Sequence, residues 1–291
     1  MKRIVIVALA AYCWTLCAVA EGEAVFLSKS SGFEHSCIKW DDTKESHVDR
    51  VLKKLAPQFG TAVLCTKDAS LINADNLKKY KLVIFFTTLD LDEEGSDKNP
   101  PMKPSGQAEL IEWINNGGGF MGFHCASDTF HTPEGAEVTP YIKMVGGEFR
   151  GHGAQFDGIV RVVDKTHPAM AHVPTEWTIK DEWYLFKNLN ADSIHVLATL
   201  DSGPERLKQE MYNIPNYPII WCSELGKGRV FYNAMGHRED VWDAEAFQQS
   251  VVDAAKWVMG DGPANAEPNL AKVLPAGDIV KVQAAPPAEK K

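Results

Sequence analysis

A glycine-rich stretch of the chain ends in a histidine. Residues 117–128 read GGGFMGFHCASD, in which a short apolar run stops at His124 with Cys125 beside it. The small residues two positions before and after His124 match the pattern of a nucleophile elbow, a sharp turn that carries a reactive side chain out of a strand. Imidazole exchanges protons near neutral pH and binds divalent metals. We therefore expect His124 to be functional and Cys125 to be a small packing residue.

Three further histidines follow or neighbour apolar runs. His35 comes after AVFLS, His237 comes after GRVFYNAM, and His152 lies between glycines in RGHGAQ. In an open parallel sheet, ligands bind outside the carboxyl ends of the strands. We therefore expect these side chains to share one cleft with His124. Glu239, two residues after His237, is the carboxylate expected to orient the His237 imidazole.

The segment KDEWY adds two carboxylates and an aromatic residue. Asp181 and Glu182 are candidate members of the same cleft. The run WYLF, which begins at Trp183, is a candidate lining that faces a sugar ring, because aromatic rings supply large apolar contact area.

These residues suit two kinds of chemistry. Two or three histidines with a carboxylate can bind zinc or another divalent ion, and His124, His152 and His237 are the candidate ligands. The same histidines can act as general acid and base without a metal. Compact signatures such as H-E-x-x-H and C-x-x-C do not occur in the sequence. A metal site would have to be assembled from distant segments, and the sequence leaves both chemistries open.

Strands and helices alternate in the first part of the chain. Four apolar runs are predicted strands, at 24–28, 61–66, 81–88 and 120–123, and two segments are predicted helices, at 47–60 and 107–116. This order predicts an α/β fold in which a mostly parallel central sheet has helices on both faces. Later strands are predicted at 158–164, 193–200, 217–223 and 228–235, followed by a helix at 244–260. The sequence GKG predicts a hairpin between the last two strands.

Both ends of the chain differ in composition from the middle. Residues 1–20 have a basic start, an apolar stretch and the small-residue site Ala18-Val19-Ala20, which predicts a secretory signal peptide cleaved before Glu21. An uncleaved anchor is the alternative, although the stretch is short for spanning a bilayer. We expect one domain at 21–260 and a flexible Pro/Ala-rich tail at 261–291. The mature protein is expected to be periplasmic or extracellular, with no membrane segment.

The formal net charge of -9 and the lack of a basic cluster argue against a nucleic-acid partner. Of the six cysteines, four lie beyond the predicted signal peptide: Cys37, Cys65, Cys125 and Cys222. Their wide spacing is not that of a disulfide framework, and buried free thiols are expected. The sequence does not decide whether any disulfide forms or whether the chain is a homo-oligomer.

Several ordered motifs resemble those of ThuA-like (trehalose utilisation) proteins over about residues 24–258: SGFEH, GGGFMGFH, GGEFRGH, HPAM, DEWY and GKGRVFYNAMGHRED. The resemblance implies the fold of class I glutamine amidotransferases, a flavodoxin-like three-layer sandwich. It also implies a role in the use of trehalose or related disaccharides, by way of oxidised (3-keto) sugars. In the wider superfamily the elbow carries a catalytic cysteine, and an H-P-E motif supplies histidine and glutamate. By position, His124 replaces that cysteine, and His237 with Glu239 resembles the H-P-E pair.

Three functions remain open at this point. The first is an exported hydrolase, lyase or isomerase acting on a disaccharide or keto-sugar, with His124 and His237 as proton-transfer groups or metal ligands and Glu239 orienting His237. Its substrate pocket is formed by His35, His152, Asp181, Glu182 and Trp183. The second is a non-catalytic sugar-binding accessory protein. The third is cysteine hydrolysis or amidotransfer through Cys125, which the histidine at the elbow apex disfavours.

Overall fold

A nine-stranded sheet runs through the middle of the computed structural model, which describes residues 23–263 and 265–279. The predicted signal peptide lies outside the described residues. The strands in chain order are β1 (Ala24–Leu27), β2 (Val63–Thr66), β3 (Leu82–Phe85), β4 (Gly119–Phe123), β5 (Glu148–His152), β6 (Phe156–Val162), β7 (Glu176–Asp181), β8 (Tyr184–Lys187), β9 (His195–Asp201), β10 (Tyr217–Leu225) and β11 (Gly228–Asn233). The large sheet has the order β2-β1-β3-β4-β11-β10-β9-β6-β7, and β5 pairs with β8 separately.

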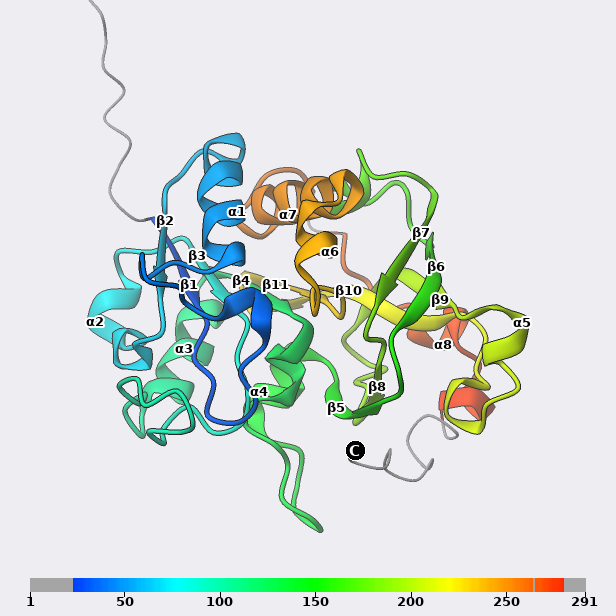
Figure 1. The fold of residues 1–291 in the computed structure, drawn as a ribbon, viewed down its shortest axis with the longest axis horizontal. Coiled ribbons are helices and arrows are strands. Elements are labelled where there is room, and N and C mark those ends of the chain that lie inside the picture. The colour runs from blue at the N-terminus through cyan, green and yellow to red at the C-terminus, as the bar shows by residue number, and fades with distance from the viewer. Residues whose placement is uncertain (1–22, 264, 280–291) are drawn as a thin grey trace, which may run out of the picture.

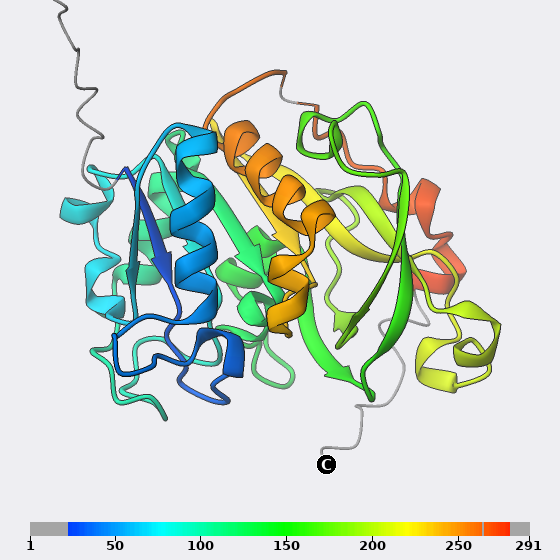
Figure 2. The same ribbon diagram turned by 45° about the horizontal axis from the view of Figure 1, so that its top comes forward.

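The helices are α1 (His47–Leu55), α2 (Ala74–Leu77), α3 (Gly106–Asn115), α4 (Pro140–Val145), α5 (Gly203–Arg206), α6 (Glu239–Asp243), α7 (Glu245–Val258) and α8 (Leu270–Val273). Helices α1 and α7 cover one face of the sheet, and α3 and α4 cover the other (Figures 1 and 2). The strand–helix alternation predicted for the first part of the chain is confirmed from β1 to β4. In the described residues, no helix is both long and apolar enough to cross a membrane.

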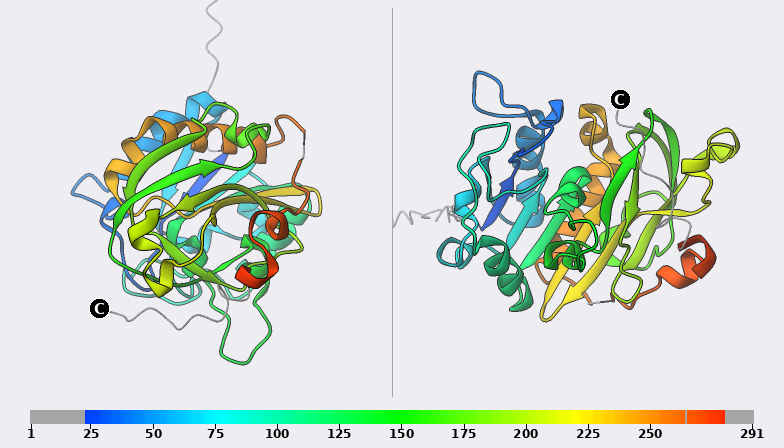
Figure 3. Two further views of the ribbon diagram at one scale, coloured as in Figure 1. Left: turned by 90° about the vertical axis from the view of Figure 1, so that its right-hand side faces the viewer. Right: turned by 90° about the horizontal axis from the view of Figure 1, so that it is seen from below.

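The predicted mostly parallel sheet is parallel in only half of its width. Strands β2, β1, β3, β4 and β11 pair in parallel, whereas β11, β10, β9, β6 and β7 pair antiparallel. The predicted GKG hairpin causes the change, because a two-residue turn between β10 and β11 can only return the chain antiparallel. The right view of Figure 3 shows the strands side by side, from the blue β1 to the green β6 and β7.

The predicted helix at 47–60 is shorter than expected. Helix α1 ends at Leu55, and a 3-10 turn (Ala56–Phe59) containing Pro57 follows it before Gly60 at φ 80°. Proline lacks the amide hydrogen that would continue the α-helical hydrogen bonds, so the chain tightens there. Strands β5, β7 and β8 were not predicted, because their segments contain glycines, charges and candidate site residues that obscure an alternating pattern.

The segment after residue 260 is not the flexible tail that its composition predicts, at least as far as residue 279. Leu270 and Leu274 are fully buried. The Asn269 side chain accepts a hydrogen bond from Val196 N and donates one to Val196 O, so it extends the hydrogen bonding of β9. Two leucines and one asparagine are therefore sufficient to dock this Pro/Ala-rich segment against the sheet. Residues 264 and 280–291 lie outside the described residues.

A histidine clamped between two carboxylates ties the elbow segment to the small sheet. Asp128 ends the 3-10 helix (His124–Asp128) that follows β4, and Glu148 begins β5. His131 Nε2 lies 2.5 Å from Asp128 Oδ1, and its Nδ1 lies 2.9 Å from Glu148 Oε1. Burial alone would lower the pKa of His131, but the hydrogen bonds to the two carboxylates outweigh it and raise this pKa to about 9.

This clamp predicts a pH-dependent contribution to stability. Because the folded-state pKa of His131 exceeds the unfolded value of about 6.5, its contribution is fully present below pH 6.5 and is lost as the pH rises through about 9. The difference in unfolding free energy between the wild type and His131→Gln should therefore be largest near pH 6 and shrink towards pH 10, as measured by denaturant titration. His172→Gln is the control, because the His172 side chain is 70% exposed and should matter little at either pH. A difference that stays constant with pH would contradict the clamp.

Candidate functional site

Four side chains from separate segments converge at one edge of the sheet. They are referred to below as the His–Glu group: His35, His124, Glu182 and His237. One potential ligand atom from each lies within 4.8 Å of those of the others. Apart from His237, which is partly exposed, the members are buried. Three of the four histidines that the sequence predicted to share one cleft therefore lie together at this edge.

Strand direction explains why these four meet. His35 follows β1, His124 follows β4 and His237 follows β11, and these strands run parallel, so their carboxyl ends share an edge. Glu182 follows β7, which is separated from β11 by four successive antiparallel pairings. Four reversals restore the original direction, so β7 also ends at this edge. Figure 1 shows β6 and β7 turned away from the direction of β10, so that the sheet curls at this end.

A buried carboxylate ties the end of β7 to the loop that carries His237. The Asp181 carboxylate accepts one hydrogen bond from Gly236 N at 2.7 Å and another from Glu182 N at 2.8 Å. Asp181 is fully buried, and burial raises the pKa of its carboxyl group. We therefore assign Asp181 to positioning the loop rather than to substrate contact, which differs from its expected place in the pocket.

The turn at His124 has the predicted elbow geometry. His124 has φ +43°, in the left-handed region that a non-glycine residue rarely adopts. A Cβ atom built on Gly122 would lie 3.1 Å from Ala126 Cβ, which explains the small residues on both sides of the apex. The His124 Nδ1 atom lies 2.9 Å from Ala234 O. Since a carbonyl oxygen can only accept, Nδ1 carries a hydrogen, which leaves Nε2 as the atom that faces the other members of the group.

The remaining distances match those between the ligands of one small metal ion. His124 Nε2 lies 3.3 Å from His237 Nδ1, and Glu182 Oε2 lies 3.1 Å from His237 Nδ1 and 3.5 Å from His124 Nε2. Ligands about 2.0–2.2 Å from a tetrahedral zinc ion stand roughly 3.3–3.6 Å apart. His35 adds a buried Nδ1 atom that has no hydrogen-bond partner. A metal ion would bind all of these nitrogen and oxygen atoms at once, whereas without it they compete for hydrogen-bond partners.

The protonation states also suit a metal. Burial, helped by the neighbouring imidazoles of His124 and His237, holds the pKa of His35 well below its usual value, so His35 is neutral at pH 7. Burial alone would raise the pKa of Glu182, but hydrogen bonds with His124 and His237 outweigh it and lower this pKa well below the ordinary range. Burial alone would lower the pKa of His237, but its contact with Glu182 outweighs this effect and raises that pKa. Glu182 and His35 are therefore in the form that binds cations, and a metal ion would take the place of the proton that His237 shares with Glu182.

Two members of the predicted catalytic and metal sets have other positions. His152 is not in the His–Glu group: its Nδ1 lies 3.2 Å from Glu182 Oε1, and its side chain is 41% exposed, so it lies at the mouth of the site. Glu239 does not pair with His237, because it begins α6 and its carboxylate accepts a hydrogen bond from Ser36. Glu182 makes the contact with His237 that Glu239 was expected to make.

Trp183 was expected to line the substrate pocket, but the structure places it in the core. It is fully buried, and its indole N–H donates to Phe156 O at 2.9 Å. Successive side chains of an extended segment alternate in direction, so Asp181 and Trp183 point inward while Glu182 between them reaches the His–Glu group. Tyr184, the second residue of the predicted WYLF lining, is the one that approaches the site: the centroid of its ring lies 3.9 Å from that of His124.

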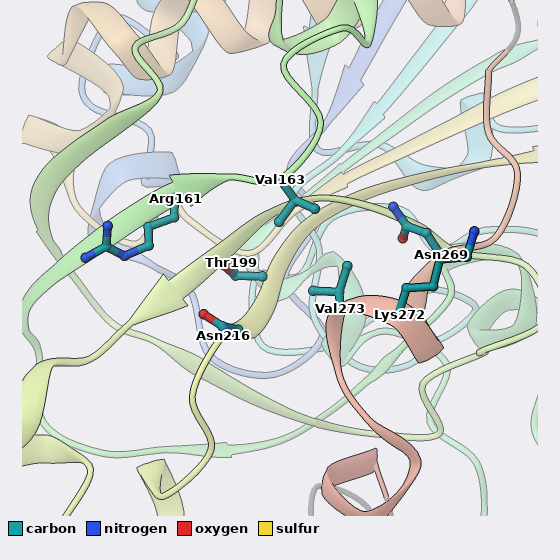
Figure 4. A pocket seen from close by; sticks show the side chains of 7 residues that line it. All are labelled: Arg161, Val163, Thr199, Asn216, Asn269, Lys272 and Val273. Carbon is teal, nitrogen blue, oxygen red and sulfur yellow. The ribbon is translucent and has the colours of Figure 1, made fainter.

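A separate surface depression of about 480 Å³ contains none of these residues (Figure 4). Its lining comes from β6, β9 and the segment around α8: Arg161, Val163, Thr199, Asn216, Asn269, Lys272 and Val273. The Arg161 guanidinium is already paired with Asp201 at 2.9 Å and with Glu176. This depression offers no unpaired arginine for a ligand, so the His–Glu group remains the candidate site.

The fold and the site define an α/β sandwich protein with a histidine–carboxylate centre at its strand ends, which fits a flavodoxin-like sandwich. The family model described as ThuA, trehalose utilisation, matches residues 24–258, and the chain belongs to this family.

Solved structures agree with this fold. The chain is similar to a ThuA-like protein from Bacteroides uniformis, with 21% identity, 86% of this chain and 96% of that chain covered, and a TM-score of 0.61. A ThuA-like protein from Parabacteroides merdae shows 19% identity, coverage of 85% and 95%, and a TM-score of 0.60. A cytoplasmic protein from Salmonella typhimurium shows 11% identity, coverage of 81% and 98%, and a TM-score of 0.52. No curated protein matches the chain. At these identities the likeness concerns the fold alone.

Cys125 is buried beneath the elbow, as expected for a packing residue. Cys37, Cys65, Cys125 and Cys222 are all free in the structure, and Cys65 is the one that is partly exposed among these four. Burial, reinforced by the nearby Asp128 carboxylate, raises the pKa of the Cys125 thiol well above its usual value. A thiol that is neutral and enclosed is a poor nucleophile.

Native protein should therefore resist alkylation at Cys125. After brief treatment with iodoacetamide at pH 8, peptide mass spectrometry should find Cys125 unmodified, and labelling should become complete once guanidinium unfolds the chain. Cys65 is the internal comparison, because it is partly exposed. Rapid native labelling of Cys125 ahead of Cys65 would revive a cysteine mechanism.

Proposed function

We propose that this chain is a metal-dependent enzyme that acts on trehalose, a related disaccharide or its 3-keto derivative. The His–Glu group would hold one divalent ion such as zinc. The observation that carries the proposal is the convergence of four donors, from four segments far apart in the chain, within 4.8 Å of one another. Membership of the trehalose utilisation family supports a saccharide substrate.

Two contacts beside the candidate ligand atoms support catalysis at such an ion. The bond from His124 Nδ1 to Ala234 O fixes the orientation of one ligand ring. A divalent ion would polarise a carbonyl or hydroxyl oxygen of the sugar, or activate a water molecule. His152 lies beside Glu182 with its ring partly in solvent, so it is placed to exchange protons with substrate and bulk water.

The reaction that these groups fit best is proton transfer next to a ketone. In a 3-keto disaccharide, the C–H bond beside the ketone is acidified, and a histidine can remove that proton. Loss of the proton leads either to isomerisation or to elimination. In elimination, the new C=C bond forms as the glycosidic C–O bond breaks, and the departing sugar oxygen takes up a proton. His152 is the exposed imidazole assigned to this transfer.

Metal content tests the proposal directly. Purified wild-type protein, dialysed against buffer containing micromolar zinc, should carry about one ion per chain by inductively coupled plasma mass spectrometry. His124→Ala and Glu182→Gln should each lower metal affinity by about 10-fold or more, because each removes one of four ligands. The matched control is His172→Ala, whose side chain is 70% exposed and lies outside the His–Glu group.

Turnover of trehalose and of 3-keto-trehalose, with and without chelator, separates the remaining possibilities. Loss of turnover on chelation supports the metal-dependent enzyme. Turnover by protein that binds no metal would identify the metal-free acid–base alternative. Saccharide binding with no product would identify a non-catalytic binding protein instead.

We also assign the fold to the class I glutamine amidotransferase-like superfamily, with His124 at the place of the elbow cysteine. The positive φ of His124 directly after β4 supports this assignment. The buried and neutral Cys125 thiol argues that thioester chemistry is not retained.

Export of the mature protein is part of the proposal and has its own test. Expressed in a Gram-negative host, the full chain should appear in the periplasm or medium with Glu21 as its N-terminal residue, as read by Edman sequencing or intact mass. Replacing Ala18 and Ala20 by leucine should leave uncleaved precursor, because the peptidase requires small residues there. A cytoplasmic product that still begins at Met1 would contradict export.

A further inference from the structure

Two exposed apolar side chains flank the His–Glu group. Large hydrophobic residues that are exposed in the described part of the chain are Phe33 at 67%, Leu89 at 41%, Leu64 at 42% and Val163 at 42%. The Phe33 ring meets the His35 ring edge to face, with centroids 5.0 Å apart. A Cβ atom on Gly32 would lie 2.7 Å from Leu89 Cδ1, so the Leu89 side chain packs against the backbone beside Phe33. Phe33 and Leu89, which lie beside the same turn at Gly32, are referred to below as the apolar rim.

Hydrogen bonds hold this rim in place. Gly32 N donates to Thr88 Oγ1 at 3.1 Å, and Thr88 Oγ1 donates to Phe33 O at 3.3 Å. The backbone that carries the second side chain is also held, since Leu89 N donates to Asp128 O at 2.6 Å. Leu89 also has φ +57°, a conformation that costs free energy for a leucine. The exposure of both side chains is thus imposed by the folded backbone.

The rim is small and continuous with the site. A stable protein interface buries about 800 Å² on each partner, far more than two side chains offer. A pyranose ring matches it better, because one face of the ring presents C–H groups and its edges present hydroxyl groups. Resting on Phe33, such a ring would direct its edge towards the polar atoms around His35 and His237, whose rings lie 5.0 Å apart between centroids.

We propose that Phe33 and Leu89 form a platform for the apolar face of one sugar ring, so that the linked ring of the disaccharide is presented to the His–Glu group. This inference rests on the proposed function, because it places the saccharide relative to the metal. Stacking on a rigid exposed ring orients the substrate with little loss of side-chain entropy. Phe33 is therefore a binding and positioning residue rather than a catalytic one.

The test measures trehalose and 3-keto-trehalose binding by isothermal titration calorimetry with zinc-loaded protein. Phe33→Ala should weaken binding by about 10-fold, as expected for the loss of about 1.4 kcal/mol of stacking and burial. Phe33→Trp should retain wild-type affinity, because it keeps an aromatic face. Leu64→Ala is the matched control, since Leu64 is also exposed but lies on strand β2, and it should bind as the wild type does.

Measuring the zinc content of every variant distinguishes a failure of the platform from a failure of the metal site. All three variants should retain wild-type zinc, because Phe33 and Leu64 are not among the candidate ligands. Wild-type affinity in Phe33→Ala, equal losses in Phe33→Ala and Leu64→Ala, or no saccharide binding by the zinc-loaded wild type would each overturn the platform. Wild-type protein that binds no zinc would overturn the metal site instead. The same titrations on that metal-free protein would still decide the platform.

Discussion

The direction in which β7 ends determines whether this protein has a site at all. Three imidazoles follow parallel strands that end at this edge of the sheet. The carboxylate follows β7, which is the last strand of the antiparallel half. Glu182 reaches them because four strand reversals return β7 to the original direction and the sheet curls. The hydrogen bond from Gly236 N to Asp181 then ties that end to the histidine loop. Without this closure, the three imidazoles would lie together without the carboxylate that contacts His124 and His237.

Burial gives this arrangement its chemical character. A carboxylate and three imidazoles removed from water carry a desolvation cost that their mutual contacts offset only in part. The group lowers the pKa of Glu182 and that of His35 and raises that of His237, so Glu182 is ionised and His35 is neutral. A divalent ion would satisfy such a set, as we propose. The inference comes from the type, spacing and charge of the donors.

The elbow after β4 has a histidine at its apex. Its sharp turn places the apex residue outside the packed sheet whatever that residue is, and here the apex is an imidazole whose Nδ1 is tied to Ala234 O. The neighbouring thiol points into the core and is held neutral. An imidazole, rather than the neighbouring thiol, therefore occupies the apex of this turn. In the proposed function, the exposed rim at Phe33 supplies an apolar surface for a sugar beside this polar centre.

The sequence by itself determined the features that depend on neighbouring residues. Apolar periodicity and caps predicted β1 to β4 with α1 and α3, and the small residues around His124 predicted its turn. The GKG motif predicted the hairpin that makes half of the sheet antiparallel, although we predicted a mostly parallel sheet. Only the tertiary structure decided that Glu182, rather than Glu239, contacts His237, and that His35, rather than His152, completes the group. It also decided that Trp183 is buried and that Leu270 docks the segment after residue 260. These outcomes depend on long-range strand pairing and sheet curvature, which bring together residues far apart in the chain and leave no local pattern to read.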